Sequence, residues 1–374
     1  IALDPDLKEW DGLGFALQAY QKRALPAIDW IIDLAKRSSK KLKVRLVKGA
    51  YWDSEIKMAQ ESGLDQYPVF TRKSNTDVSY LCCAQKLLAN RDVLYPCFAT
   101  HNAQSVAAIY NFANKENHGY EFQKLHGMGQ ALYNNIVGPN NLGLKCRVYA
   151  PVGGHEELLP YLVRRLLENG ANNSFVNRLV DDRAPIEDII ADPIDKVNRI
   201  SKKSNAQIPL PRDLYDKKWL NSYGPDLSDI NAVNRIYDDF DYYLQKEFFA
   251  YPIINGKLLN HRNARTISNP ANKDHVIGSA HDCPSEVINE VFEISVKAQK
   301  QWGKTNVDDR AKCLENMADI LEEEMNFFMT ILTIEGGKTI DDCVSEVREA
   351  IDFCRYYAAE IRDNKHKHQQ FHCH

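Results

Sequence analysis

The chain contains 374 residues, of which 44% are hydrophobic and 26% charged, a composition typical of a folded globular protein of about two domains. Its net charge of −4 excludes a basic nucleic-acid-binding surface spread over the whole molecule. No apolar run approaches the roughly 18 residues that span a bilayer, and no signal peptide opens the sequence. The nine cysteines lack disulfide or metal spacing, so we expect reduced thiols in a cytoplasmic chain.

Up to about residue 177, short apolar runs alternate with segments of helical periodicity, such as Ala24–Leu34. This alternation predicts a parallel sheet covered by helices. Five strands are expected, at Leu13–Ala19, Leu42–Val47, Leu94–Ala99, Tyr120–Leu125 and Lys145–Ala150.

Two architectures share this alternation, the open doubly wound sheet and the eight-stranded barrel. A dinucleotide-binding open sheet should carry GxGxxG, but Gly12-Leu13-Gly14 and Gly127-Met128-Gly129 both lack the third glycine. Polar residues follow several strand ends instead, which is typical of a barrel. Since a barrel needs eight units, we expect the missing three to precede Ile1.

The remainder of the chain divides into three parts by composition. Residues 179–245 are polar and proline-punctuated, and we interpret them as a helical connector. Residues 246–363 open with β-rich segments and continue with periodic helices expected at Ser285–Trp302, Val307–Ile331 and Asp341–Arg362. The histidine-rich tail, 364–374, is expected to be disordered, and we assign it no metal site.

The segment Arg45–Asp53 (RLVKGAYWD) follows the second expected strand. Alternate side chains of a barrel strand face its interior, so Arg45 and Val47 share that side. An inward arginine is costly unless it meets an anion or an electron-rich ring. A salt-bridged structural role and a cofactor role for Arg45 therefore remain equal alternatives on the residues alone.

The segment Tyr161–Glu168 (YLVRRLLE) places Arg164 and Arg165 on the same helical face as Tyr161. Two adjacent guanidinium groups suit a carboxylate, which the planar fork binds bidentately. The simpler alternative is a solvated charged face, although the helix start can face a barrel mouth. The apolar packing of this helix is expected from Leu158, Leu159, Leu162, Val163 and Leu166.

Five segments resemble the flavin-dependent proline dehydrogenase barrel of the bifunctional proline utilisation family, PutA. They are RLVKGAYWDSEI (45–56), FATHN (98–102), LHGMG (125–129), YAPVG (149–153) and YLVRRLLENGAN (161–172). The segment Glu346–Arg362 is similar to the start of an aldehyde dehydrogenase domain. The resemblance implies an α/β fold: part of a (β/α)8 barrel over 1–178, the connector, and the N-terminal part of an aldehyde-dehydrogenase-like domain.

The resemblance also implies FAD-dependent oxidation of L-proline to 1-pyrroline-5-carboxylate, with membrane quinone accepting the electrons. The product would reach glutamate through an NAD-dependent semialdehyde dehydrogenase, whose catalytic residues we expect beyond Arg362. The intact protein would be a cytoplasmic homo-oligomer with peripheral association at the inner membrane face, and this chain would bind no nucleic acid. The alternative is a catalytically incompetent fragment or scaffold that needs a separate N-terminal half.

By this resemblance, Arg164 and Arg165 would hold the proline carboxylate, and Tyr51, Tyr149, Tyr161 and Leu125 would enclose its ring. Arg45, Tyr51 and Tyr149 would be the catalytic residues, with Arg45 against the flavin near N5. The expected cofactor-lining residues are Gln18, Arg45, Val47, Lys48, Gly49, Ala50 and Trp52. Arg72, Thr100 and His101 would hold the ribityl and pyrophosphate part, and Glu168 would support the adenosine end.

Overall fold

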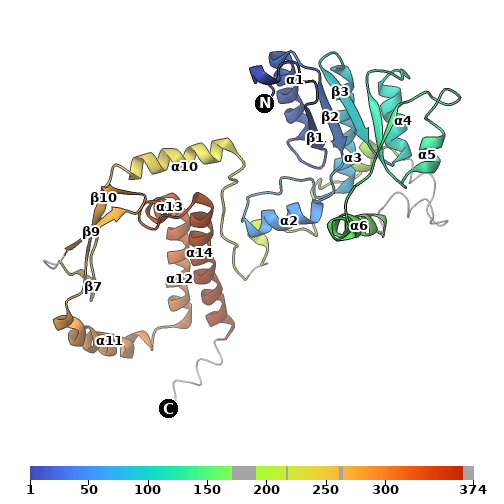
Figure 1. Ribbon diagram of the computed structural model, residues 1–374. Coiled ribbons are helices and arrows are strands. Elements are labelled where there is room, and N and C mark those ends of the chain that lie inside the picture. Colours follow the sequence, from blue (N-terminus) through green and yellow to red (C-terminus); the bar gives the residue numbers. More distant parts are fainter. Residues whose placement is uncertain (171–190, 216–217, 261–263, 365–374) are drawn as a thin grey trace. The chain divides into compact units, whose positions relative to one another are not determined.

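The computed structural model describes residues 1–170, 191–215, 218–260 and 264–364, which form two compact units (Figure 1). The first unit comprises residues 1–56 and 68–208, and the second comprises residues 57–67 and 209–374. The expected connector 179–245 is thus shared between the two units, and the tail from residue 365 lies outside the described residues.

The first unit is built on a parallel sheet of five strands in the order β1-β2-β3-β4-β5, which is also their order in the chain. A doubly wound sheet reverses direction at a switch point, whereas a barrel adds each strand beside the previous one. The sequential order confirms the expected partial barrel. The strands are β1 (Gly14–Gln18), β2 (Leu42–Val47), β3 (Leu94–Ala99), β4 (Glu121–Leu125) and β5 (Cys146–Tyr149).

Helices connect these strands in the expected alternation. They are α1 (Ala24–Ser38), α2 (Trp52–Glu61), α3 (Lys73–Ala89), α4 (Ala103–Phe112), α5 (Gln130–Asn134) and α6 (His155–Gly170), followed by α9 (Pro193–Asn198). Local chemistry sets their ends: Ser39 ends α1 in the left-handed conformation, and the Asn102 side chain caps α4 by accepting from Ser105 N at 3.0 Å.

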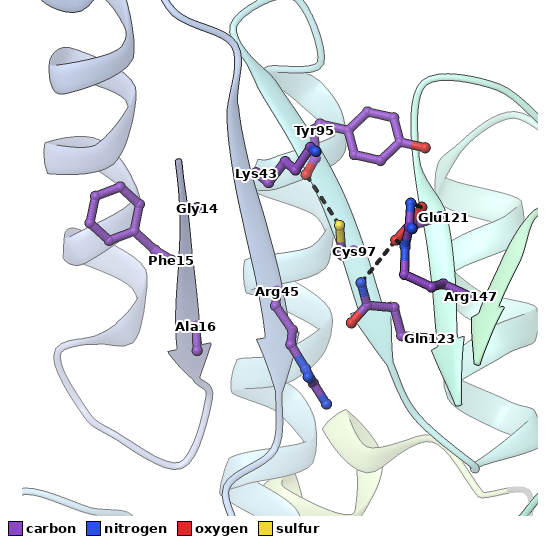
Figure 2. A pocket seen from close by; sticks show the side chains of 10 residues that line it. All are labelled: Gly14, Phe15, Ala16, Lys43, Arg45, Tyr95, Cys97, Glu121, Gln123 and Arg147. Carbon is purple, nitrogen blue, oxygen red and sulfur yellow. Dashed lines mark hydrogen bonds and ion pairs between the residues drawn. The ribbon is translucent and has the colours of Figure 1, made fainter. Parts of the chain in front are cut away.

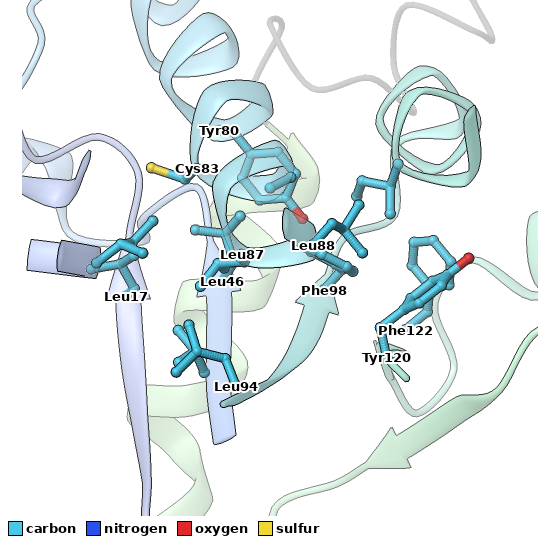
Figure 3. Packing of buried hydrophobic residues seen from close by; sticks show 14 of the residues in the cluster. Leu17, Leu46, Tyr80, Cys83, Leu87, Leu88, Leu94, Phe98, Tyr120 and Phe122 are labelled. Carbon is cyan, nitrogen blue, oxygen red and sulfur yellow. The ribbon is translucent and has the colours of Figure 1, made fainter. Parts of the chain in front are cut away.

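One face of the sheet packs against helices α1, α3 and α4 to form the core of the first unit (Figure 3). Leu46, Phe98 and Phe122 of three successive strands are fully buried on this face, with Tyr80 and Leu87 of α3 against them. The alternate residues of the sheet include Lys43 and Arg45 of β2, Glu121 of β4 and Arg147 of β5. The sheet therefore has one apolar face and one polar face, and the polar face carries the site.

The second unit contains a small mixed sheet and a group of helices. Strand β10 (Asn272–His281) pairs antiparallel with β9 (Ala264–Asn269) and parallel with β6 (Phe248–Ala250), while β7 (Ile253–Ile254) and β8 (Lys257–Leu258) form a hairpin. The helices are α10 (Ile230–Tyr243), α11 (Ile288–Trp302), α12 (Val307–Glu323), α13 (Met325–Ile334) and α14 (Ile340–Asp363).

The single helix expected over Val307–Ile331 is wrong, because the chain forms α12 and α13 with a break at Glu324. The sequence of α13 is almost entirely apolar, and the change of direction lets Met325 and Met329 enter the core while α12 keeps a polar face.

No helix in the described part of the chain is long and apolar enough to cross a membrane.

A buried ion network ties α12 to α14 and to the segment before α10. Glu322 accepts hydrogen bonds from Arg355 at 3.0 Å, from Arg212 at 2.9 Å and from the backbone N–H of Tyr223 at 2.7 Å. Burial alone would raise the pKa of Glu322, but these three donors lower it to about 2. The side chain of Arg355 is only 7% exposed, so this network is a structural feature of the core.

Candidate functional site

The polar face of the first unit's sheet borders an open pocket of about 300 Å³ (Figure 2). Residues of all five strands line it, and they include side chains of both charges and a thiol. The lining residues are Gly14, Phe15, Ala16, Lys43, Arg45, Tyr95, Cys97, Glu121, Gln123 and Arg147.

Arg45 meets an aromatic ring on this face. Its guanidinium carbon lies 4.2 Å from the ring centroid of Tyr149, and within the described residues it forms no ion pair with a carboxylate. A cation over an aromatic ring is stabilised by the ring quadrupole. Two alternatives for Arg45 were left open by the sequence. Within the described residues, Arg45 is therefore not the salt-bridged structural arginine.

A second inward pair, Glu121 and Arg147, was not recognised from the sequence. Arg147 Nε and Nη2 donate to the two carboxylate oxygens of Glu121 at 2.8 and 2.9 Å, and Gln123 Nε2 donates to Oε1 at 2.8 Å. Burial alone would raise the pKa of Glu121, but the hydrogen bonds from Arg147 and Gln123 outweigh it and lower that pKa. The signal in the sequence was the two-residue spacing that puts Arg147 on the same strand face as Tyr149.

The segment Lys48–Trp52 turns from the end of β2 into α2. Lys48 forms an ion pair with Asp77 of α3, and Gly49 adopts a φ of +129°, which favours glycine. Trp52 Nε1 donates to the carbonyl of Phe70 at 2.8 Å. Ala50 and Tyr51 are exposed.

Thr100 and His101 follow β3 and are fixed by neighbouring backbone. The Tyr133 hydroxyl donates to the carbonyl of Thr100 at 2.7 Å, and His101 Nε2 accepts from the backbone N–H of Leu125 at 3.2 Å. Burial, together with the positive charges of Arg165 and Lys124, lowers the pKa of His101. His101 is therefore held as a neutral imidazole at the carboxyl ends of β3 and β4.

Helix α6 turns Tyr161 and Arg165 inward. Both side chains are half-buried, and the guanidinium carbon of Arg165 lies 5.3 Å from the Tyr161 ring centroid. The positive charge of Arg165 also contributes to the lowered pKa of His101. The Tyr161 hydroxyl is buried and has no hydrogen-bond partner among the described residues. The side chains of Arg164 and Glu168 lie outside the described part of the structure.

The expected apolar packing of this helix is wrong for three of its residues. Leu159, Leu162 and Val163 are 60%, 48% and 44% exposed. Because Tyr161 and Arg165 occupy the inner side of α6, the helical period turns these three residues away from it. Because Arg165 is half-buried, it does not belong to a solvated charged face, which was the alternative for this helix.

The other expected site residues are dispersed around this edge. Gln18 and Val47 are half-buried partners in the β1–β2 register, and Leu125 is only 4% exposed. Arg72 donates through Nε to the carbonyl of Ser204 at 3.0 Å, a contact between distant parts of the chain that the sequence pattern does not predict. Among the described residues, no group of three His, Cys, Asp or Glu side chains could hold a metal ion.

The two parts of the chain match two family models. Residues 1–178 match the proline dehydrogenase model, and residues 260–373 match the aldehyde dehydrogenase family model. The bifunctional protein PutA of Salmonella typhimurium is 43% identical over 375 residues, which cover 97% of this chain. This chain belongs to the PutA family.

Solved PutA structures agree with this membership. A PutA structure with proline bound in remote sites is 43% identical and superposes with a TM-score of 0.78, covering 96% of this chain and 33% of that one. PutA from Bdellovibrio bacteriovorus, inactivated by N-propargylglycine, is 28% identical with a TM-score of 0.80, covering 96% and 37%. The chain spans 28% of the length of the Salmonella PutA.

Proposed function

We propose that this chain supplies the proline-binding and flavin-contacting face of an FAD-dependent site that oxidises L-proline to 1-pyrroline-5-carboxylate. The observation that carries the proposal is the inward turn of α6, which brings Arg165 and Tyr161 to the edge where His101 and Leu125 lie. Membership of the PutA family supports the same reaction.

Arg165 would bind the carboxylate of proline. It is half-buried, so a carboxylate there would be partly shielded from water, which strengthens the charge-assisted hydrogen bonds of a guanidinium. Arg164 precedes Arg165 on α6 and would be the second arginine that binds this carboxylate. The buried Tyr161 hydroxyl offers a further donor to the same ligand. Leu125, Tyr51 and Tyr149 would enclose the apolar part of the ring.

The donor groups of this edge suit FAD. His101 accepts from Leu125 N–H through Nε2, so its neutral imidazole carries the proton on Nδ1, where it can donate to an anionic oxygen of the cofactor. Arg45, resting on the Tyr149 ring, keeps guanidinium donors for the flavin ring and would favour negative charge developing there. Lys48 shares its charge with Asp77, so it contributes less net attraction. FAD, when bound, would accept the hydride that leaves the carbon beside the proline nitrogen.

The remaining expected contacts with FAD would lie along the same edge of the sheet. Gln18, Val47, Gly49, Ala50 and Trp52 would line the flavin. Arg72 and Thr100 would face its ribityl and pyrophosphate part, and Glu168 its adenosine end. Arg72 already donates to Ser204, so binding the cofactor would require it to share or exchange that carbonyl.

The second unit would be part of the domain that oxidises glutamate semialdehyde with NAD, as its match to the aldehyde dehydrogenase model supports. Membrane quinone as electron acceptor, homo-oligomer formation by the intact protein and cytoplasmic location with peripheral membrane association belong to the same proposal. A scaffold that acts only with a separate N-terminal half is the second candidate, because the described sheet has five of the eight strands that a closed barrel requires.

The experiment is a proline-dependent dye reduction assay with added FAD. The chain is produced alone, and also together with the part of Salmonella PutA that precedes the matched region. Proline-dependent reduction in either sample supports the reaction, and reduction only in the second sample favours the scaffold. Absence of reduction and of FAD binding in both samples would overturn the proposal.

A further inference from the structure

Tyr20 lies two residues after the end of β1 and is buried, with only 2% of its surface exposed. Its backbone N–H donates to the carbonyl of Lys48 at 2.8 Å, and the N–H of Ala19 donates to Val47 at 2.8 Å. The pairing of β1 with β2 thus continues past the strand end and stops at Gly49. The backbone of this tyrosine therefore fixes where the turn into α2 begins.

The ring of Tyr20 fills the space beside Gly49. A Cβ atom at residue 49 would lie 2.5 Å from the Cγ and Cδ2 atoms of this ring, well inside van der Waals contact. The contact explains why this position requires glycine on steric grounds in addition to its φ of +129°. The ring also limits how far the turn can move toward the core.

The hydroxyl of Tyr20 reaches the first turn of α2. It donates to Glu55 Oε1 at 3.0 Å, and Gln21 Nε2 donates to the same oxygen at 3.0 Å. Burial, reinforced by Glu55, raises the pKa of Tyr20, so the hydroxyl keeps the proton that it donates. A second path runs from the Tyr20 carbonyl, which accepts from Phe70 N at 2.8 Å, while the Phe70 carbonyl accepts from Trp52 Nε1.

We propose that Tyr20 is a positioning residue, which sets the backbone of Lys48–Trp52 through its contact with Gly49 and its hydrogen bond to Glu55. Tyr20 is thus tied to both ends of this five-residue segment, through its backbone N–H at Lys48 and through its carbonyl and Phe70 at Trp52, and its hydroxyl holds Glu55 just beyond the segment. The role in catalysis rests on the proposed function, because this segment is the one expected to line the flavin. The structural part of the proposal does not depend on FAD.

The test uses the full chain with Tyr20→Phe, Tyr20→Leu and, as a matched control, Tyr110→Phe on the outer helix α4. Amide hydrogen exchange is measured by mass spectrometry. In Tyr20→Phe we expect exchange at residues 53–56 to be faster by about tenfold, and in Tyr20→Leu also at Ala19 and Phe70. Exchange elsewhere in the sheet and in the control should be unchanged. Unchanged exchange in both Tyr20 variants, or an equal increase throughout the unit, would overturn the positioning role.

Where the flavin-loaded protein turns over proline, a second readout follows. Tyr20→Leu should weaken FAD binding by about tenfold or more and lower kcat, with a smaller effect on the KM for proline because Arg165 on α6 is not affected, and Tyr20→Phe should restore most of the FAD binding and of kcat. Equal loss in both variants, or an increase in KM alone, would contradict the catalytic part. If no sample binds FAD, the proposed function fails while the exchange result still decides the positioning role.

Discussion

Arg45 of β2 and Tyr149 of β5 touch across the polar face of the sheet, with 4.2 Å between the guanidinium carbon and the ring centroid. The two strands are separated by β3 and β4. In a flat sheet they would lie about 14 Å apart, given a strand spacing of about 4.8 Å. The two side chains bridge this separation on the polar face, as inward side chains of a barrel wall do.

This contact should be measurable as a coupling energy. In a double-mutant cycle with Arg45→Met and Tyr149→Leu, followed by urea unfolding of the first unit, we expect an interaction of about 0.5–1 kcal/mol. The same cycle between Arg45 and Tyr110 on the outer helix should give a value near zero. Equal coupling in both cycles would mean that the ring of Tyr149 adds nothing to the stability of Arg45.

The Glu121–Arg147 pair predicts an acid sensitivity of the first unit. The pKa of Glu121 is lower in the folded than in the unfolded chain, so its stabilisation is fully present above the unfolded pKa and is lost as pH falls through the folded pKa. The free energy of unfolding of the wild type should therefore fall more steeply below about pH 4.3 than that of Glu121→Gln. Parallel pH curves for the two proteins would contradict this.

His101 predicts a second pH effect, at higher pH. Its pKa is lowered in the folded state, so the unfolded chain binds a proton first as pH falls, and stability declines from about pH 6.5 downward. NMR titration of the histidine side chains should show His101 titrating below that value, and His101→Gln should remove this part of the decline. Protonation would also replace the acceptor of Leu125 N–H by a donor. A titration at or above 6.5 would contradict the expected neutral form.

The buried network of the second unit predicts a large stability effect. Arg355→Met leaves Glu322 buried with fewer donors, and we expect a loss of about 3 kcal/mol in the free energy of unfolding. Lys338→Met, which removes an exposed pair with Glu346, should leave the free energy of unfolding nearly unchanged. Similar losses in the two variants would show that the burial of Arg355 has little energetic consequence. Both values come from chemical unfolding followed by circular dichroism.

The sequence was informative where structure depends on neighbours along the chain. Alternating apolar runs predicted all five strands, and β2 and β3 begin and end at the expected residues. The inward side of Arg45 also followed from the strand period, and its need for an anion or a ring anticipated Tyr149. Gly49 was expected only as a cofactor-lining residue, whereas the structure also places the ring of Tyr20 against it.

The sequence was uninformative where structure depends on register or on the orientation of whole elements. Glu121 and Arg147 meet only because β4 and β5 pair in one register. Which face of α6 turns inward is decided by tertiary packing, so the exposed side of Leu159 and Leu162 could not be read from a helix that is apolar on several sides. The break at Glu324 likewise depends on the core that receives Met329.

The role of Arg165 is tested most directly by the KM for L-proline in flavin-loaded protein carrying Arg165→Met. Loss of charge-assisted hydrogen bonds to the carboxylate should raise this KM by about 30-fold or more, equivalent to about 2 kcal/mol. Arg91→Met, in the turn between α3 and β3, serves as the control and should leave the KM unchanged. With pyrrolidine, which lacks the carboxylate, wild type and Arg165→Met should behave alike. An unchanged KM for proline in Arg165→Met would contradict a carboxylate grip from α6.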